Sequence, residues 1–510
     1  MLSNLLKQGE VAKARSQSLV NVDGTSLGHT GFLAVNSSSG KRTNQMFMWF
    51  QPCTDCDPAT APFIHWFNGG PGSPDTVGVL NQIGTHYVDA SQTLHERCFS
   101  WCRTSNCLFF DSPVGTGFSF QTDHDGAIVK PADVEYTSTS AEATAQVLEA
   151  LKQFYSIWPE YVESRYYVHG LSYGGHYVPH MAHTVRAHNR GGGIPRINLH
   201  GLAVGDPILD AKYQYPTVAP TLTAFGLVDE REAGIIDAIM ANASALNDHD
   251  CVASFNEWNR VFNDDGGSSC APHCEFLFEA YTGSSYTEHV LLGAPPASMS
   301  HFRPWLTNHA PSLHAAHTPG ANASFAEGGA VYAAMVASGD FCESTARLYA
   351  DLLLAADDPI DVLVYAGNLD PLLGASQAAA GVHAIFDEAA AHVAGGGAAA
   401  RDAFYAAKKV VWRVGKDDDA PAGYARCLEQ RHARFCHVVL RNSGHEAPSY
   451  QPRATYDLSG RFISRRAWDG PGPPRRRSCH SARRAAARNH SPGPRFRRAR
   501  SDWRHVVITL

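Results

Sequence analysis

The chain has 510 residues, of which 44% are hydrophobic and 18% are charged, and its formal net charge is −7. This composition is sufficient for one large hydrophobic core and excludes a chain that is disordered throughout. From residue 465 onward the chain has thirteen Arg and two Asp but no Lys or Glu, so the preceding part carries −18. Such an acidic body argues against nucleic acid as the main partner. The longest apolar runs are too short to span a membrane.

Short runs of apolar residues, several ending at Gly or Pro, predict the strands of one sheet. They lie at 63–67, 107–111, 166–169, 201–204, 362–366 and 437–440. An apolar stripe with helical spacing covers 138–155, between the second and third runs. Alternating strands and helices predict an α/β fold with a mostly parallel central sheet. From about 210 to 357 the pattern is helical with few strand signals, which predicts an insertion or cap.

The two ends of the chain differ from its body. We expect the folded domain to cover 26–464 and leave the order of 1–25 open. Residues 465–510 are rich in Arg and Pro, which predicts disorder or an abnormal end of the gene model. Residues 1–14 lack the apolar segment of a signal peptide, which leaves open a start further upstream or a cytosolic protein.

Twelve cysteines include close groups at 53/56, 98/102/107 and 270/274, a spacing compatible with disulfides or metal ligands. No nearby combination of His and Cys completes a zinc pattern, so disulfides are favoured over a metal site. Sequons at Asn36, Asn242 and Asn322 fit the same oxidising, secretory environment.

A candidate nucleophile lies in Gly170-Leu171-Ser172-Tyr173-Gly174, which directly follows the predicted strand 166–169 and precedes an apolar run. This is the strand–turn–helix context of a nucleophile elbow. A serine hydroxyl needs an imidazole as general base and a carboxylate to hold the imidazole's tautomer. Downstream, Asp370 follows strand 362–366 and His445 follows strand 437–440, in the order Ser, Asp, His. The glycine-rich turn at 66–72 follows strand 63–67 and offers N–H groups to a tetrahedral oxyanion.

Five segments in this order resemble the serine carboxypeptidase family, over roughly residues 31–463. They are WFNGGPGS at 66–73, DSPVGTGFSF at 111–120, GLSYGGHYVP at 170–179, YAGNLD at 365–370 and SGHEAPSYQP at 443–452. The segment LAVGDPILD at 202–210 is similar to the vitellogenic-like carboxypeptidase branch.

The resemblance implies an α/β-hydrolase fold with a helical insertion above the active site. It implies an acid-active exopeptidase of the secretory pathway, lysosome or vacuole that cleaves peptide or protein C-termini without a metal or other cofactor. A homodimer is left open. The family's residue roles then fall on the catalytic Ser172, Asp370 and His445, on the oxyanion-hole N–H groups of Gly70 and Tyr173, and on Asn68 and Gly69 as ligands of the substrate carboxylate.

Among the departures from the family pattern, two bear on substrate binding. Leu171 stands where the residue before the nucleophile is normally acidic, and Gln82 aligns with a second family Glu. In the family these two carboxyl groups, protonated at low pH, help to bind the substrate carboxylate. We therefore assign Gln82 to the carboxylate site. We predict a weaker preference for free C-termini and a flatter acid limb of the pH profile of activity. Two alternative functions stay open: a serine carboxypeptidase-like acyltransferase or esterase, and a catalytically idle binding scaffold.

Overall fold

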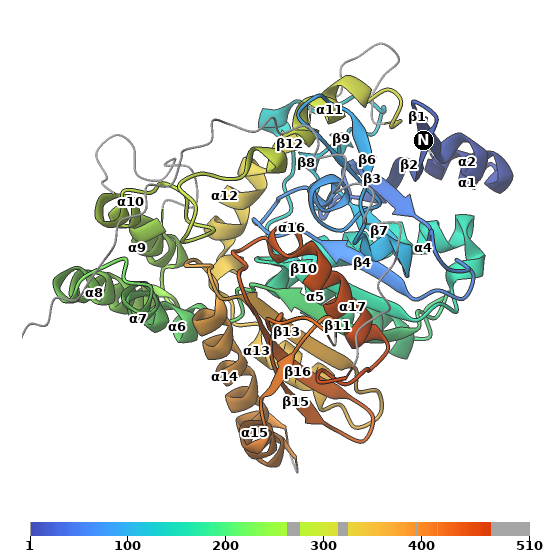
Figure 1. Ribbon diagram of the computed structural model, residues 1–510. Helices are drawn as coiled ribbons and strands as arrows, with labels where there is room; N and C mark the ends of the chain where they lie inside the picture. The colour runs from blue at the N-terminus through green and yellow to red at the C-terminus, as the bar shows by residue number, and fades with distance from the viewer. Residues whose placement is uncertain (1, 263–275, 315–324, 394–395, 416, 471–510) are drawn as a thin grey trace, which may run out of the picture. The chain divides into compact units, whose positions relative to one another are not determined.

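A computed structural model describes residues 2–262, 276–314, 325–393, 396–415 and 417–470 (Figure 1). Six parallel strands form the centre of its main sheet. In spatial order they are β7 (Asn106–Phe110), β4 (Phe63–Phe67), β10 (Tyr166–Leu171), β11 (Leu199–Gly205), β13 (Asp361–Gly367) and β16 (Arg434–Leu440). The predicted α/β class with a mostly parallel sheet is therefore confirmed, and each strand lies within a few residues of its predicted position.

Antiparallel strands extend this sheet at both edges, and the sequence pattern did not predict them. Beyond β7 lie β3 (Thr43–Gln51), β2 (Thr25–Asn36) and β1 (Leu19–Val22), with β9 (Phe120–Thr122) also paired to β3. Beyond β16 lie β15 (Gly423–Glu429) and β14 (Val410–Trp412). The N-terminal helices α1 (Leu2–Lys7) and α2 (Val11–Ser18) precede β1.

Helices cover both faces of the sheet because successive strand residues point to opposite sides. Phe63 and Val168 face one core with α4 (Ser140–Ile157), α5 (Gly174–Arg190), α13 (Ala346–Leu353) and α14 (Ala375–His392). Ile64 and Tyr167 face the other core with α17 (Pro452–Ile463), which lies in front of the strands in Figure 1. The strand ends are thereby fixed from both sides.

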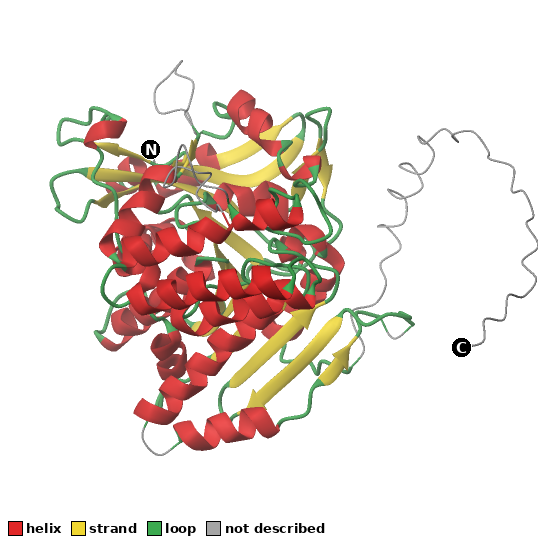
Figure 2. Cartoon of the chain, turned by 90° about the vertical axis from the view of Figure 1, so that its left-hand side faces the viewer, coloured by secondary structure: helices red, strands yellow, loops and turns green. Residues whose placement is uncertain are grey.

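A helical insertion separates β11 from β13, as the sequence predicted. In Figure 1 its helices α7 to α10 lie to the left of the sheet, and Figure 2 views the molecule from that side. The described part comprises α6 (Ala211–Gln214), α7 (Val218–Ala224), α8 (Glu230–Leu246), α9 (Cys251–Phe262), α10 (Leu277–Thr282), α11 (Phe302–His309), the short β12 (Ala326–Glu327), α12 (Gly329–Ser338) and α13.

The remaining elements are short or peripheral. Besides several single 3-10 turns, they are α3 (Asp75–Val77), the π-helical turn η1 (Gly78–Gln82), β5 (His86–Val88), β6 (Leu94–Glu96), β8 (Thr116–Gly117), α15 (Gly397–Ala406) and α16 (Ala447–Tyr450). No helix among the described residues is both long and apolar enough to cross a membrane.

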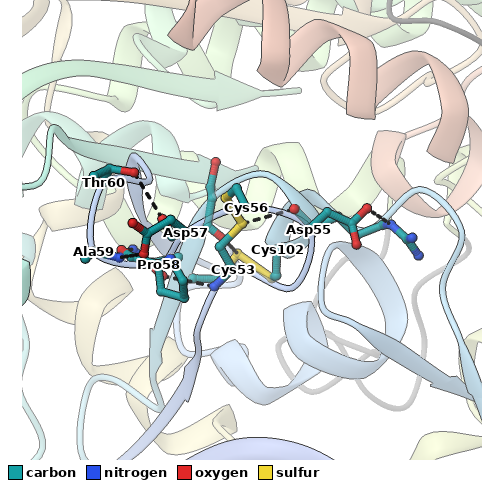
Figure 3. Close-up of a disulfide and its surroundings, with 12 residues drawn as sticks. Cys53, Asp55, Cys56, Asp57, Pro58, Ala59, Thr60 and Cys102 are labelled. Carbon is teal, nitrogen blue, oxygen red and sulfur yellow. Dashed lines mark hydrogen bonds and ion pairs between the residues drawn. A yellow bond between two sulfur atoms is a disulfide. The ribbon is translucent and has the colours of Figure 1, made fainter.

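Among the described residues, disulfides join four pairs of cysteines, which confirms the preference for disulfides over metal ligation at Cys53/Cys56 and Cys102/Cys107. The pairs are Cys53–Cys56, Cys102–Cys107, Cys251–Cys342 and Cys427–Cys436. Figure 3 shows Cys53 and Cys56 in their turn, with Cys102 beside them. Cys270, Cys274, the sequon at Asn322 and residues 471–510 lie outside the described residues.

Candidate active site

Ser172 occupies a tight turn between β10 and α5. Its φ is +60°, in the left-handed region that few non-glycine residues adopt, and its backbone N–H donates to Gly205 O at 2.8 Å. The flanking glycines allow this turn: a Cβ on Gly170 would lie 2.9 Å from Phe67 O, and one on Gly175 would lie 1.9 Å from Ile208 O. Ser172 is partly exposed between buried neighbours. The geometry is that of a nucleophile elbow.

His445 and Asp370 form a hydrogen-bonded pair at the carboxyl ends of neighbouring strands β16 and β13. His445 Nδ1 lies 2.8 Å from Asp370 Oδ2, and both side chains are buried. Asp370 Oδ1 accepts from the backbone N–H groups of Leu372 and Leu373, at 2.8 and 3.2 Å. This arrangement places the proton on Nδ1, so that Nε2 is left as an acceptor.

The insertion holds the His445 loop in place. The backbone N–H of His445 donates to Glu288 O at 2.8 Å, and that of Val290 donates to Leu369 O at 3.0 Å. A Cβ on Gly444 would lie 2.3 Å from Glu288 O, so only glycine fits there. The segment around Glu288 therefore lies against the loops that carry both His445 and Asp370.

The glycine-rich turn packs directly on the elbow. A Cβ on Gly69 would lie 2.5 Å from Ser172 Cβ and 2.8 Å from Tyr173 N. Gly70 has a φ of +104°, which favours glycine. Buried Asp75 holds the start of the turn, because its Oδ1 accepts from Asn68 N at 2.6 Å. The backbone of the turn and the N–H of Tyr173 thus lie side by side.

A cavity of about 550 Å³ joins these parts. Ser172 and His445 line it together, and residues of α9 and α12 in the insertion form part of its wall. The cavity is also lined by Asn68, Gly69 and Gln82, which the sequence predicted to bind a substrate carboxylate. Gly70 and Leu171 line it as well. Tyr173 and Asp370 are not lining residues, but they contact residues that are.

The side chains at the predicted carboxylate site differ in their hydrogen bonds. Asn68 Nδ2 donates to Ser73 Oγ and to Pro74 O, both at 3.2 Å, and Asn68 Oδ1 accepts from Trp66 Nε1. Gln82 is 2% exposed, and neither atom of its side-chain amide has a hydrogen-bond partner among the described residues. Leu171 is 3% exposed and belongs to the core on the α17 side of the sheet.

The cavity lining includes two carboxyl groups, Glu288 and Glu446, whose proximity the sequence did not predict. Glu446, which directly follows His445 in the sequence, accepts from Asn81 Nδ2 at 2.7 Å and from Ser449 Oγ at 3.0 Å. Glu288 Oε2 accepts from Tyr286 OH at 2.9 Å. Burial and the charge of Glu446 raise the pKa of Glu288 to about 7, and burial also raises the pKa of Glu446. No sequence signal links Glu288 to the site, because it comes from the insertion.

The electrostatics of the site centre on His445. Burial lowers its pKa, but the contacting Asp370 carboxylate, with contributions from Asp206 and Glu288, raises the pKa overall to about 10. Asp206 and Glu288 contribute only when they are ionised. The basicity of His445 therefore depends on the protonation of two further acids.

Comparisons with known proteins agree with this site. A model of the serine carboxypeptidase family matches residues 23–465. A mouse (Mus musculus) protein named probable serine carboxypeptidase CPVL is 28% identical over 473 residues, which cover 92% of this chain and 90% of that protein. Vitellogenic carboxypeptidase of Aedes aegypti is 26% identical over 467 residues, covering 90% and 89%. The similarity to the vitellogenic-like branch is thus supported.

Among solved structures, the prohormone-processing carboxypeptidase Kex1(Δ)p of Saccharomyces cerevisiae aligns with a TM-score of 0.65 and 19% identity. The alignment covers 86% of this chain and 91% of that one, and it supports the α/β-hydrolase fold. Neither the acyltransferase or esterase alternative nor the idle scaffold is favoured by these matches. The chain belongs to the serine carboxypeptidase family and is a serine-type carboxypeptidase.

Proposed function

We propose that Ser172, His445 and Asp370 are the catalytic triad that cleaves C-terminal peptide bonds. Nε2 of His445 removes the proton from Ser172 Oγ as this oxygen attacks the scissile carbonyl carbon. The C–N bond then breaks, and the same imidazole returns the proton to the leaving amine. Water, deprotonated by His445, attacks the acyl-enzyme and releases the shortened peptide and Ser172.

The backbone N–H groups of Gly70 and Tyr173 are proposed to stabilise the oxyanion. Support comes from the close packing of the 69–70 turn on the elbow, with Tyr173 N facing the position of a Gly69 Cβ. Donors fixed by backbone need no reorganisation when charge develops on the oxygen. The positive end of α5 points at the same place, since Ser172 lies just before its first turn.

The observation that carries the proposal is the 2.8 Å contact between His445 Nδ1 and Asp370 Oδ2, with His445 and Ser172 lining one cavity. A fluorophosphonate probe should label the protein, and Ser172→Ala should abolish labelling. Mass spectrometry of a peptide incubated with the enzyme should show residues lost one by one from the C-terminus. Persistent labelling of Ser172→Ala would assign the nucleophile elsewhere, and internal cleavage would contradict exopeptidase action.

We further propose that the substrate carboxylate binds beside Asn68, Gly69 and Gln82, and that Leu171 leaves this site without one hydrogen-bond donor. Leu171 and Gln82 both line the cavity, and Asn68 can serve the carboxylate only by sharing its bonds to Ser73 and Pro74. Loss of one charge-assisted hydrogen bond weakens binding roughly ten- to hundredfold. The preference for a free acid should be correspondingly small.

This second proposal is tested by kcat/KM for a peptide and for its C-terminal amide, measured between pH 4 and pH 7. We expect a modest preference for the free acid, which Leu171→Gln should increase by returning a donor. A strong preference that grows with acidity in the unmodified enzyme would contradict the proposed role of Leu171.

We also propose that the protein acts in the secretory pathway, in a lysosome or vacuole, or outside the cell. Four disulfides support an oxidising compartment, and the sequons at Asn36 and Asn242 are on exposed residues. Protein purified from its natural source should shift in mass on treatment with a glycosidase that removes N-linked glycans. An unmodified mass together with reduced cysteines would contradict this location.

A further inference from the structure

Asp206 is a buried acid close to Asp370 and His445 of the proposed triad. It follows β11, the strand between those that lead to Ser172 and to Asp370. Its side chain is 0% exposed, and its φ of +43° is in the left-handed region that non-glycine residues rarely adopt. Carboxyl oxygens of Asp206 and Asp370 and a ring nitrogen of His445 all lie within 4.8 Å of one another. The carboxyl group of Asp206 thus lies beside the Asp370 carboxyl group and the His445 imidazole.

The hydrogen bonds of Asp206 are incomplete if it is a carboxylate. Its Oδ1 accepts from Gly367 N at 2.7 Å, and its backbone N–H donates to Tyr365 O at 2.7 Å. Its Oδ2 is buried and receives no bond from an N–H or O–H donor in the described part of the chain. Among the described residues no Lys or Arg pairs with it either, although an ionised buried carboxylate needs such partners.

A proton on Asp206 removes both difficulties. As a carboxylic acid it can form its side-chain hydrogen bond with Asp370, and two carboxyl groups in contact cannot both be ionised without strong repulsion. Burial first, and then the charge of Asp370, raise the pKa of Asp206 well above the usual value for an aspartic acid. The other titratable groups around it are His445, which opposes this shift, and Tyr365, while Glu288 acts on His445 from the insertion.

We propose that Asp206 is a positioning residue of the active site, a neutral carboxylic acid that donates a hydrogen bond to Asp370 and thereby fixes the carboxylate that orients His445. The proposal rests on the triad proposed above. It ties three strand ends together, since Asp206 also holds Gly367 at the end of β13. Because a neutral Asp206 adds no second negative charge beside His445, the imidazole is more readily available as a base.

Two substitutions separate this role from a purely structural one. Asp206→Asn keeps both an acceptor for Gly367 N and a donor for Asp370, whereas Asp206→Leu has similar size but neither. The control is Asp361→Asn, a buried acid at the opposite end of β13 that pairs with Arg465. It should reduce stability without moving the pH profile of the active site.

The assay is the second-order rate of fluorophosphonate labelling as a function of pH, which does not depend on the peptide substrate. Asp206→Leu should react roughly ten- to hundredfold more slowly than the unmodified enzyme. Asp206→Asn should recover most of that rate and keep the acid limb at the same pH. A Leu variant with full reactivity would overturn the positioning role. An acid limb lowered by about one unit in the Asn variant would show that Asp206 is normally ionised.

A second measurement holds even if the Leu variant fails to fold. The infrared difference spectrum between the unmodified enzyme and Asp206→Asn at pH 7 should contain the C=O stretch of one protonated carboxylic acid, and its absence would overturn the proposal. Failure of the triad itself is distinguishable, because it would appear as labelling that survives Ser172→Ala whatever the state of Asp206.

Discussion

Replacing Gly69 by alanine is the most direct test of how the glycine-rich turn meets the elbow. The new Cβ would lie 2.5 Å from Ser172 Cβ and 2.8 Å from both Leu171 O and Tyr173 N. Two of these atoms are backbone and the third is fixed to it, so no side-chain rotation relieves the clash. To reach ordinary contact near 3.4 Å or more, the turn and the elbow must separate by about 1 Å.

A separation of this size is large relative to the reach of a hydrogen bond. Oxyanion donors act at about 2.7–3.1 Å, so one of the N–H groups of Gly70 and Tyr173 would lose contact with the oxyanion. Loss of one such donor lowers kcat about 10²- to 10³-fold, equivalent to about 2.7–4 kcal/mol. The overpacking itself should cost about 1–3 kcal/mol of unfolding free energy.

Steady-state kinetics on a peptide and urea unfolding of Gly69→Ala would measure both effects. We expect kcat to fall by at least a hundredfold while KM changes little, because the lost bond exists mainly in the transition state. Gly234→Ala in α8, where a Cβ meets nothing within 4 Å, is the matched control and should behave like the unmodified enzyme. If Gly69→Ala kept kcat within threefold, the assignment of this turn to the oxyanion site would be refuted.

Three further predictions follow from burial, charge and the disulfides. Glu288, whose pKa is raised to about 7, should add negative charge beside His445 as the pH rises through neutrality. Glu288→Gln should therefore remove an inflection near pH 7 from the pH profile of kcat/KM. A profile identical to that of the unmodified enzyme would argue against an electrostatic effect of Glu288 on His445. The Cys251–Cys342 disulfide links α9 to a segment 91 residues away. Replacing both cysteines by serine should lower the unfolding free energy, measured in urea titrations, by about 4–5 kcal/mol. No change would mean that the disulfide is absent in solution. Burial lowers the pKa of His169 to about 3, so the unfolded chain takes up a proton first as the pH falls below about 6.5. The free energy of unfolding should then decline by up to about 1.4 kcal/mol per pH unit. His169→Phe should lose less stability than the unmodified protein between pH 7 and pH 4.5, and equal losses in the two proteins would contradict this.

The centre of the fold was predictable because its signals are local. Each central strand is a short apolar run, and the parallel strands that carry Ser172 and His445 end immediately before the turns in which these residues lie. The edge strands gave no comparable signal. β2 contains Gly28 and Gly31 and runs over 12 residues of mixed polarity, and β15 mixes apolar residues with Arg426 and Glu429 and has no continuous apolar run. Such strands depend on pairing with a neighbour more than on their own composition.

The carboxyl groups around the proposed triad could be recognised only in three dimensions. The sequence indicates that this chain has lost two acidic positions, at Leu171 beside the nucleophile and at Gln82. The structure places two others, Glu446 and Glu288, in the same cavity as Gln82 and His445.

This rearrangement changes the expected origin of the pH dependence. Carboxyl groups beside a nucleophile act mainly on the substrate carboxylate, whereas those beside the imidazole act on the base itself. As the pH falls, Glu288 becomes neutral and no longer raises the pKa of His445. The imidazole is then harder to protonate than it would be beside an acid that stayed charged. A flat acid limb of the pH profile, predicted from the sequence through weaker substrate binding, therefore has a second cause in the insertion: Glu288 loses its charge as the pH falls through about 7, and the pKa of His445 falls with it.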